Sequence, residues 1–100
     1  MANVSTVNDN AHLGQVIAAL HRLRAQLSTI HHDINNPITV LSGNVELMRE
    51  LAKAIGVESE LEDCLIDMEA ALSLLTERVD RLMVVRKVIS DATESLEKKV

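Results

Sequence analysis

The residues best suited to chemistry lie together in one segment, His31-His32-Asp33-Ile34-Asn35-Asn36-Pro37. A helix through this segment continues the apolar spacing of Ile30 and Ile34. His32 is two positions from both isoleucines, about 200° around the helix, so its imidazole points to water. Asn36 follows one turn later on the same face. An exposed imidazole with a carboxylate beside it and an amide one turn away predicts a reactive site.

Pro37 lies within the same helical pattern. Its ring clashes with the carbonyl of Asp33 and removes the backbone hydrogen bond that this carbonyl would accept. We therefore expect a bend at His32–Asp33. The alternative interpretation is a tolerated kink with solvated polar residues around it.

The elements that must position this segment are two long helices on either side of Gly56, a residue that can end a helix in the left-handed conformation. Apolar residues recur every three or four positions in each. The first series is Val16, Leu20, Leu23, Leu27, Ile30, Ile34, Leu41, Val45, Met48, Ala52 and Ile55, and the second is Leu61, Leu65, Met68, Leu72, Leu75, Val79, Leu82, Ile89 and Leu96. Residues 1–10 are polar and small, and we expect a flexible lead-in with Asn8, Asp9 or Asn10 as the N-cap. The predicted bounds are 11–55 for the first helix, 56–58 for the turn, 59–97 for the second helix and 11–98 for the domain.

The composition predicts an all-α fold. The chain has 100 residues, of which 47% are hydrophobic, and none is Phe, Tyr or Trp. Three glycines and one proline leave few sharp turns, so the elements must be few and long. Two helices alone leave half of each apolar stripe exposed to water. We therefore expect a long antiparallel helical hairpin that dimerises into a four-helix bundle. Docking of the hairpin on an unrelated partner is the alternative.

Several function classes are disfavoured by what the sequence contains. The single cysteine and the histidine spacing match no metal site, and no glycine-rich nucleotide-binding loop is present. The net charge of -5 disfavours nucleic-acid binding, including binding of RNA by a small helical bundle. The chain has no membrane-spanning run and no signal-peptide pattern, so we expect a cytoplasmic location.

The HDINNP sequence resembles the H box of sensor histidine kinases, which is a His, an Asp or Glu, two variable residues, a Thr or Asn, and a Pro. The likeness continues through NPITVLSGNVELM, which is similar to the family pattern Pro-Leu-Thr-x-Ile-x-Gly-x-x-Glu-Leu-Leu. It covers roughly residues 20–90, which resemble the dimerisation and histidine phosphotransfer (HisKA-type) domain, a homodimeric four-helix bundle. Asn44 departs from the aromatic residue often found after the glycine.

The resemblance implies a role for each matching residue. His32 would be the phosphoacceptor, and Asp33 would orient the imidazole and act as its acid or base. Asn36 would position water for dephosphorylation of a partner response regulator, and Pro37 would supply the kink. His31 lies outside the pattern, and we expect a flanking surface histidine.

The resemblance also implies partners for the chain. These are a second copy of the chain, the receiver domain of a response regulator, and an ATP-binding kinase domain acting in cis or in trans. ATP and Mg²⁺ would belong to the partner domains, and this chain would bind no cofactor. The sequence holds no ATP-binding domain, so it is either part of a larger protein-histidine kinase or a free-standing phosphotransfer protein. A dimerisation module whose histidine is never phosphorylated is a further alternative.

The hairpin register predicts a second feature. With the turn centred near Val57, His32 lies level with about residue 82. That register would gather four cations around the site as a collar for the phosphoryl group and an acidic receiver: Arg78, Arg81, Arg86 and Lys87. An ordinary solvated face, with Asp80 paired to neighbouring arginines, is the alternative.

Overall fold

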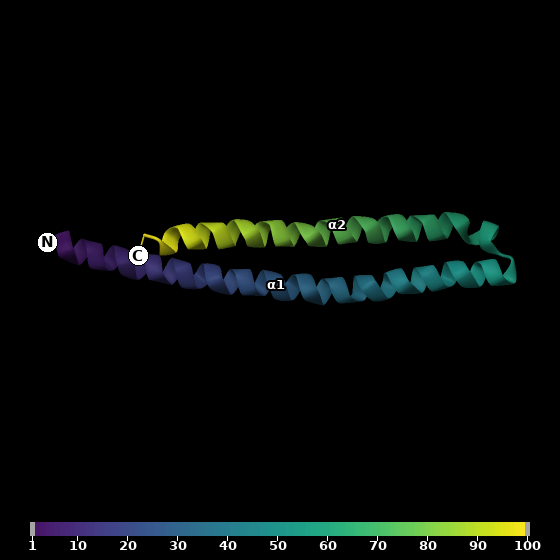
Figure 1. Cartoon of the computed structure of the whole chain (residues 1–100), viewed down its shortest axis with the longest axis horizontal. Helices are drawn as coiled ribbons and strands as arrows, with labels where there is room; N and C mark the ends of the chain where they lie inside the picture. The colour runs from purple at the N-terminus through teal and green to yellow at the C-terminus, as the bar shows by residue number, and fades with distance from the viewer. Residues whose placement is uncertain (1, 100) are drawn as a thin grey trace. The chain divides into compact units, whose positions relative to one another are not determined.

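The computed structural model describes residues 2–99, with side chains from residue 9 onward. Two helices contain almost all of these residues, α1 over Ala2–Ile55 and α2 over Glu58–Glu97 (Figure 1). No strand occurs in this described part of the chain, and the all-α class is confirmed. Pro37 lies inside α1, which continues on both sides of it.

α1 begins at Ala2 rather than near residue 11. Asn8, Asp9 and Asn10 therefore lie within the helix and not at an N-cap. The physical reason is that no glycine or proline precedes Gly14, so nothing in this polar stretch interrupts the backbone hydrogen bonds of a helix.

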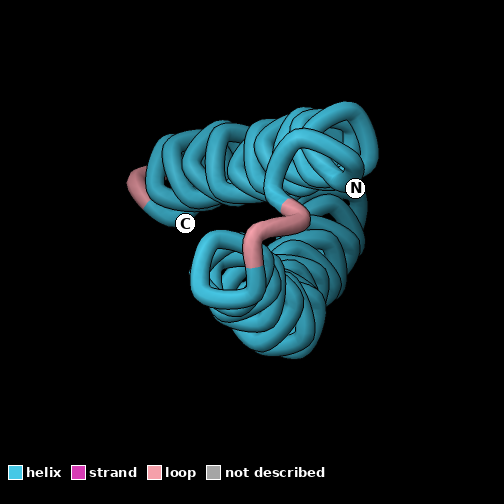
Figure 2. Tube along the Cα trace, turned by 90° about the vertical axis from the view of Figure 1, so that its right-hand side faces the viewer, coloured by secondary structure: helices cyan, strands magenta, loops and turns pink. Residues whose placement is uncertain are grey.

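A short connection at Gly56 and Val57 joins the two helices (Figure 2). Gly56 has a φ of 77°, in the left-handed region that a residue without a side chain adopts readily. Its N–H donates to the carbonyl of Lys53 at 3.3 Å, and the N–H of Val57 donates to the carbonyl of Ala52 at 2.9 Å. These two bonds satisfy the carbonyls of Ala52 and Lys53 in the last turn of α1, and the helix ends where the glycine predicted.

Residue contacts divide the chain into two units, each of which pairs a segment of α1 with an antiparallel segment of α2. The turn unit is His31–Arg81, and the terminal unit comprises residues 2–30 and 82–99. The turn unit contains the buried apolar side chains Ile38, Val45, Ala52, Leu65 and Val79. Among the described side chains of the terminal unit, Thr93 is the buried one, at 2% exposure. The predicted helical hairpin is confirmed, and its apolar core lies in the turn unit.

Candidate functional site

One face of α1 in the turn unit is less exposed than the rest of the helix. Its members alternate in spacing between four and three residues: His31, Asn35, Ile38, Ser42, Val45, Arg49 and Ala52. This spacing keeps a single face directed at the paired helix. His32 comes one residue after a member of this face and is exposed, as the sequence predicted.

Within HDINNP, the exposed side chain of Asn36 contacts the imidazole of His32. The side-chain amide nitrogen of Asn36 lies 3.5 Å from Nε2 of His32. An amide nitrogen donates, so this contact is a hydrogen bond in the tautomer that carries its proton on Nδ1 and accepts at Nε2. Asp33 and Pro37 are exposed as well. Nε2 of His32 therefore faces the amide of Asn36 on the exposed side of α1.

His31 is not the surface residue that its place outside the family pattern suggested. Its side chain is 23% exposed, and its Nε2 lies 3.4 Å from Oδ1 of Asp80 on α2. Asp80 therefore contacts His31 and not a neighbouring arginine, while Arg81 pairs with Glu77 at 3.6 Å on its own helix. The reason is the spacing of the inward face, which includes position 31 and excludes position 32.

The four cations proposed as a collar divide between the two units. Arg78 and Arg81 are exposed on α2 of the turn unit. Arg86 and Lys87 belong to the terminal unit, where Lys87 pairs with Asp91 at 3.1 Å. Arg86 is half-buried, and its buried Nε has no hydrogen-bond partner in the structure. The collar stays a prediction.

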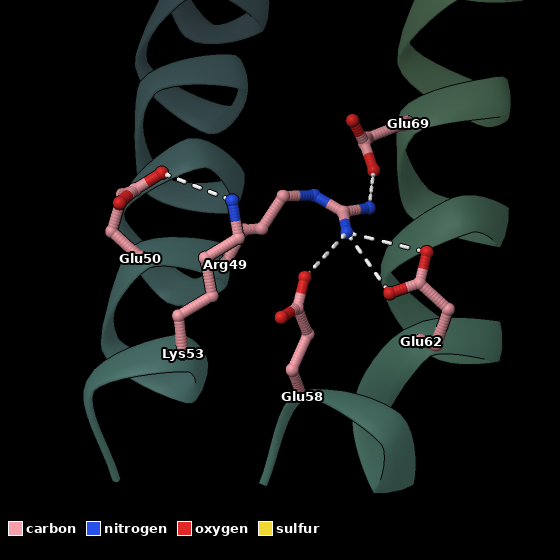
Figure 3. A network of polar contacts seen from close by, with 6 residues as sticks. All are labelled: Arg49, Glu50, Lys53, Glu58, Glu62 and Glu69. Atoms are coloured by element: carbon pink, nitrogen blue, oxygen red, sulfur yellow. Dashed lines mark hydrogen bonds and ion pairs between the residues drawn. The ribbon is translucent and has the colours of Figure 1, made fainter. Parts of the chain in front are cut away.

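A polar cluster that sequence reasoning missed lies near the turn, where Arg49 of α1 contacts three glutamates (Figure 3). Its guanidinium donates to Glu62 at 3.0 Å and to Glu69, and it lies 3.8 Å from Glu58. The hydrogen bond that Arg49 donates to Glu69 is the largest cause of the raised pKa of Arg49. Position 49 belongs to the inward face of α1, so its spacing was the signal that could have found it.

Two grooves flank the helix pair of the turn unit. An apolar groove of about 240 Å³ is lined by Leu41, Val45, Met68, Ala71, Leu72 and Leu75. A polar groove of about 250 Å³ is lined by Ser42, Val45, Glu46, Glu69, Leu72, Ser73 and Thr76. Positions seven apart share one side of a helix, so His32 falls on the side of Glu46, and Ile34 on the side of Leu41. The imidazole lies on the polar side of the hairpin.

No group of three or more His, Cys, Asp or Glu side chains among the described residues is placed to hold a metal ion. None of the described helices combines the length and the apolar character needed to cross a membrane.

The chain thus pairs two antiparallel helices and exposes an imidazole with an acid beside it and an amide one turn away. A family model described as the His Kinase A (phospho-acceptor) domain matches residues 22–90, which is more than half of the chain. The chain belongs to this HisKA family and contains the phosphoacceptor and dimerisation domain of a histidine kinase in two-component signalling. No curated protein and no solved structure matches the chain significantly.

Proposed function

We propose that His32 is the residue that carries the phosphoryl group. The observation that supports it most directly is the exposure of His32 on the polar side of the turn unit, within HDINNP. Nε2 is the nucleophile in this proposal, in the tautomer with its proton on Nδ1, and its lone pair attacks once the Asn36 amide gives up its contact. His31 is the other histidine of the segment, and its Nε2 is engaged by Asp80.

The proposed reaction begins with a neutral His32. The Nε2 lone pair attacks the γ-phosphorus of ATP, the bond from that phosphorus to its bridging oxygen breaks, and ADP leaves with the electron pair. Asp33, the next residue, takes up the Nδ1 proton of the resulting cation. In the transfer to a receiver, an aspartate oxygen attacks phosphorus and the P–N bond breaks. The electron pair returns to Nε2 while Asp33 gives the proton back.

Asn36 has a separate role in this proposal. Its amide lies one helical turn from His32 on the same exposed face, so it can hold a water molecule against a docked receiver. Attack of that water on the receiver's phosphoaspartate breaks the acyl phosphate and releases inorganic phosphate. This reaction does not use the imidazole as a nucleophile.

We also propose that the domain works as a homodimer, with the apolar side of the turn unit covered by a second copy. Large apolar side chains remain exposed on this side, including Ile34 at 40%, Leu41 at 50% and Leu75 at 46%. Their burial against a second copy would complete a four-helix bundle and leave His32 accessible on the other side.

Further partners follow from the proposed chemistry. They are the receiver domain of a response regulator and an ATP-binding kinase domain with Mg²⁺, acting in cis or in trans, and ATP as the phosphodonor favours a cytoplasmic location. A free-standing phosphotransfer protein uses His32 in the same way. A dimerisation module with an unreactive histidine is the competing function, and labelling separates the two.

The test is a labelling experiment on the parent chain and on His32→Ala. The chain is incubated with ATP and the ATP-binding domain of a histidine kinase, or with a phosphorylated receiver domain. We expect a label that is stable to alkali and lost in acid, as for a P–N bond, and absent from His32→Ala. Equal labelling of His32→Ala would refute the assignment, and an unlabelled parent would favour the dimerisation module.

A further inference from the structure

The pair of His31 and Asp80 lies directly beside the proposed phosphoacceptor. It joins α1 to α2 within the turn unit, with 3.4 Å between Nε2 of His31 and Oδ1 of Asp80. The other ion pairs between α1 and α2 in the described turn unit all involve Arg49, near the turn. At the level of His32, the polar connection between the two helices is therefore this one contact.

The backbone of α1 is weakened at the same place. Pro37 has no N–H, so the carbonyl of Asp33 lacks the hydrogen bond that holds each turn of a helix to the next. The proline ring also crowds this carbonyl. The turn that carries His32 and Asp33 therefore has less backbone restraint than its neighbours, and its orientation depends more on side-chain contacts.

We propose that His31 is a positioning residue, whose contact with Asp80 fixes the rotation of this turn and thereby directs His32 and Asp33 toward the phosphodonor. Successive residues differ by about 100° around a helix, so holding position 31 against α2 sets the direction of position 32. The inference rests on the proposed role of His32. The inference adds to the site a residue on the face of α1 that is directed at α2.

The two contacts use the adjacent imidazoles in opposite ways. A carboxylate only accepts, so Nε2–H of His31 donates to Asp80, whereas Nε2 of His32 accepts from Asn36 in the tautomer with its proton on Nδ1. On α2 the charged neighbours of Asp80 are Glu77 and Arg81, which pair with each other at 3.6 Å. Asp80 takes no part in the ion pair of Glu77 and Arg81, so its carboxylate can contact His31.

The experiment compares two phosphodonors on the full chain. Transfer from ATP, catalysed by the ATP-binding domain of a histidine kinase that labels the parent, requires a directed imidazole. Phosphoramidate, a small donor whose P–N bond breaks to release ammonia, requires only an accessible lone pair. We expect His31→Ala and Asp80→Ala each to slow the first reaction about fivefold, with less than a twofold change in the second. His31→Gln, which keeps an N–H donor, should restore the rate to within about twofold of the parent.

His21 provides a matched control. It pairs with Glu97 across the two helices of the terminal unit at 2.6 Å, but no proline and no proposed nucleophile lies beside it. His21→Ala removes an equivalent histidine–carboxylate pair and should leave both rates unchanged. Slowing by His21→Ala equal to that of His31→Ala would overturn the proposal, because general loosening of the hairpin would explain both.

The remaining outcomes are also decisive. If the parent is labelled at His32 and neither His31→Ala nor Asp80→Ala slows transfer from ATP, the positioning role is wrong while the proposed function stands. If His32 is not labelled by either donor, the proposed function fails. Amide hydrogen exchange then tests the pair by itself, since His31→Ala should speed exchange at residues 33–36 by about threefold or more and His21→Ala should not. Unchanged exchange in both variants would overturn the anchoring role.

Discussion

The turn unit and the terminal unit each join α1 to α2 through a histidine–carboxylate pair, yet they differ in what surrounds it. Around His31 and Asp80 the turn unit supplies buried apolar side chains such as Val79 and Ile38. The terminal unit pairs its helices through polar contacts, His21 with Glu97 at 2.6 Å and Arg24 with Ser90 at 3.5 Å. A buried apolar core holds the helices of the turn unit together, so its polar pair can serve orientation. In the terminal unit the described apolar side chains are at most half-buried, as at Leu20, Ile89 and Leu96, and polar contacts join the helices beside them.

The largest expected effect tests the source of stability in the turn unit. Leu65 is fully buried, at 0% exposure, and Leu65→Ala leaves a cavity among the apolar side chains of both helices. We expect a loss of about 2–5 kcal/mol in the free energy of unfolding. Urea unfolding at a fixed protein concentration, followed by circular dichroism, measures it.

Leu96→Ala is the matched control in the terminal unit, where this leucine is half-buried. Its effect should be less than half that of Leu65→Ala, because less apolar area returns to water on truncation. Equal losses in the free energy of unfolding for the two variants would show that apolar burial stabilises the two units alike.

A second prediction separates two reactions within the turn unit. Asp33→Asn should slow phosphorylation of His32 by about 10²-fold, because the asparagine side chain cannot take up the Nδ1 proton. Asn36→Ala should slow release of phosphate from a cognate receiver by about the same factor, because water is no longer held in place. Time courses of transfer and of dephosphorylation measure both. Equal depression of both reactions by both substitutions, with helix content intact, would make this face a single docking surface.

The third prediction concerns the turn itself. Gly56→Ala places a side chain at a φ of 77° and should destabilise the hairpin by about 1 kcal/mol. Gly43→Ala is the control, since the added Cβ meets no atom within 4 Å apart from the adjoining residues and backbone of its own helix, and the residue is in mid-helix. It should stabilise the chain by roughly 0.5–1 kcal/mol. Thermal unfolding of both variants gives the two signs, and a stabilising Gly56→Ala would contradict the role of the turn.

The smallest expected effect lies in the terminal unit. Lys87 and Asp91 are exposed and form an ion pair one turn apart on α2, at 3.1 Å. Lys87→Ala should change the free energy of unfolding by less than about 0.5 kcal/mol, because exposed pairs of this kind gain little in water. A loss above about 1 kcal/mol would mean that polar contacts on the outer surface stabilise this unit too.

Much of the fold could be predicted from the residues. The recurrence of apolar positions located both helices, and Gly56 located the turn, because these depend on local geometry. The start of α1 could not be placed, since the first ten residues carry neither an apolar pattern nor a helix breaker. The exposure of His32 followed from its distance of two residues from Ile30 and Ile34.

The inward partners were harder to predict. His31 and Arg49 belong to a face with the same alternating spacing as Ile38 and Val45. A search for recurring apolar residues does not detect them, because their side chains are polar. The pairing of His31 with Asp80 also depends on the register between the helices. The sequence predicted that register only to about one turn, which is too coarse to name a partner.

The contact of Arg49 with three glutamates determines which substitutions the chain can accept at these four positions. If any one of Glu58, Glu62 and Glu69 changes, the arginine keeps two partners and the remaining acids repel each other less. If the arginine changes, three like charges are left together without a cation. Each acid is thus individually replaceable while the base is not, and related sequences should vary at the three glutamate positions before they vary at position 49.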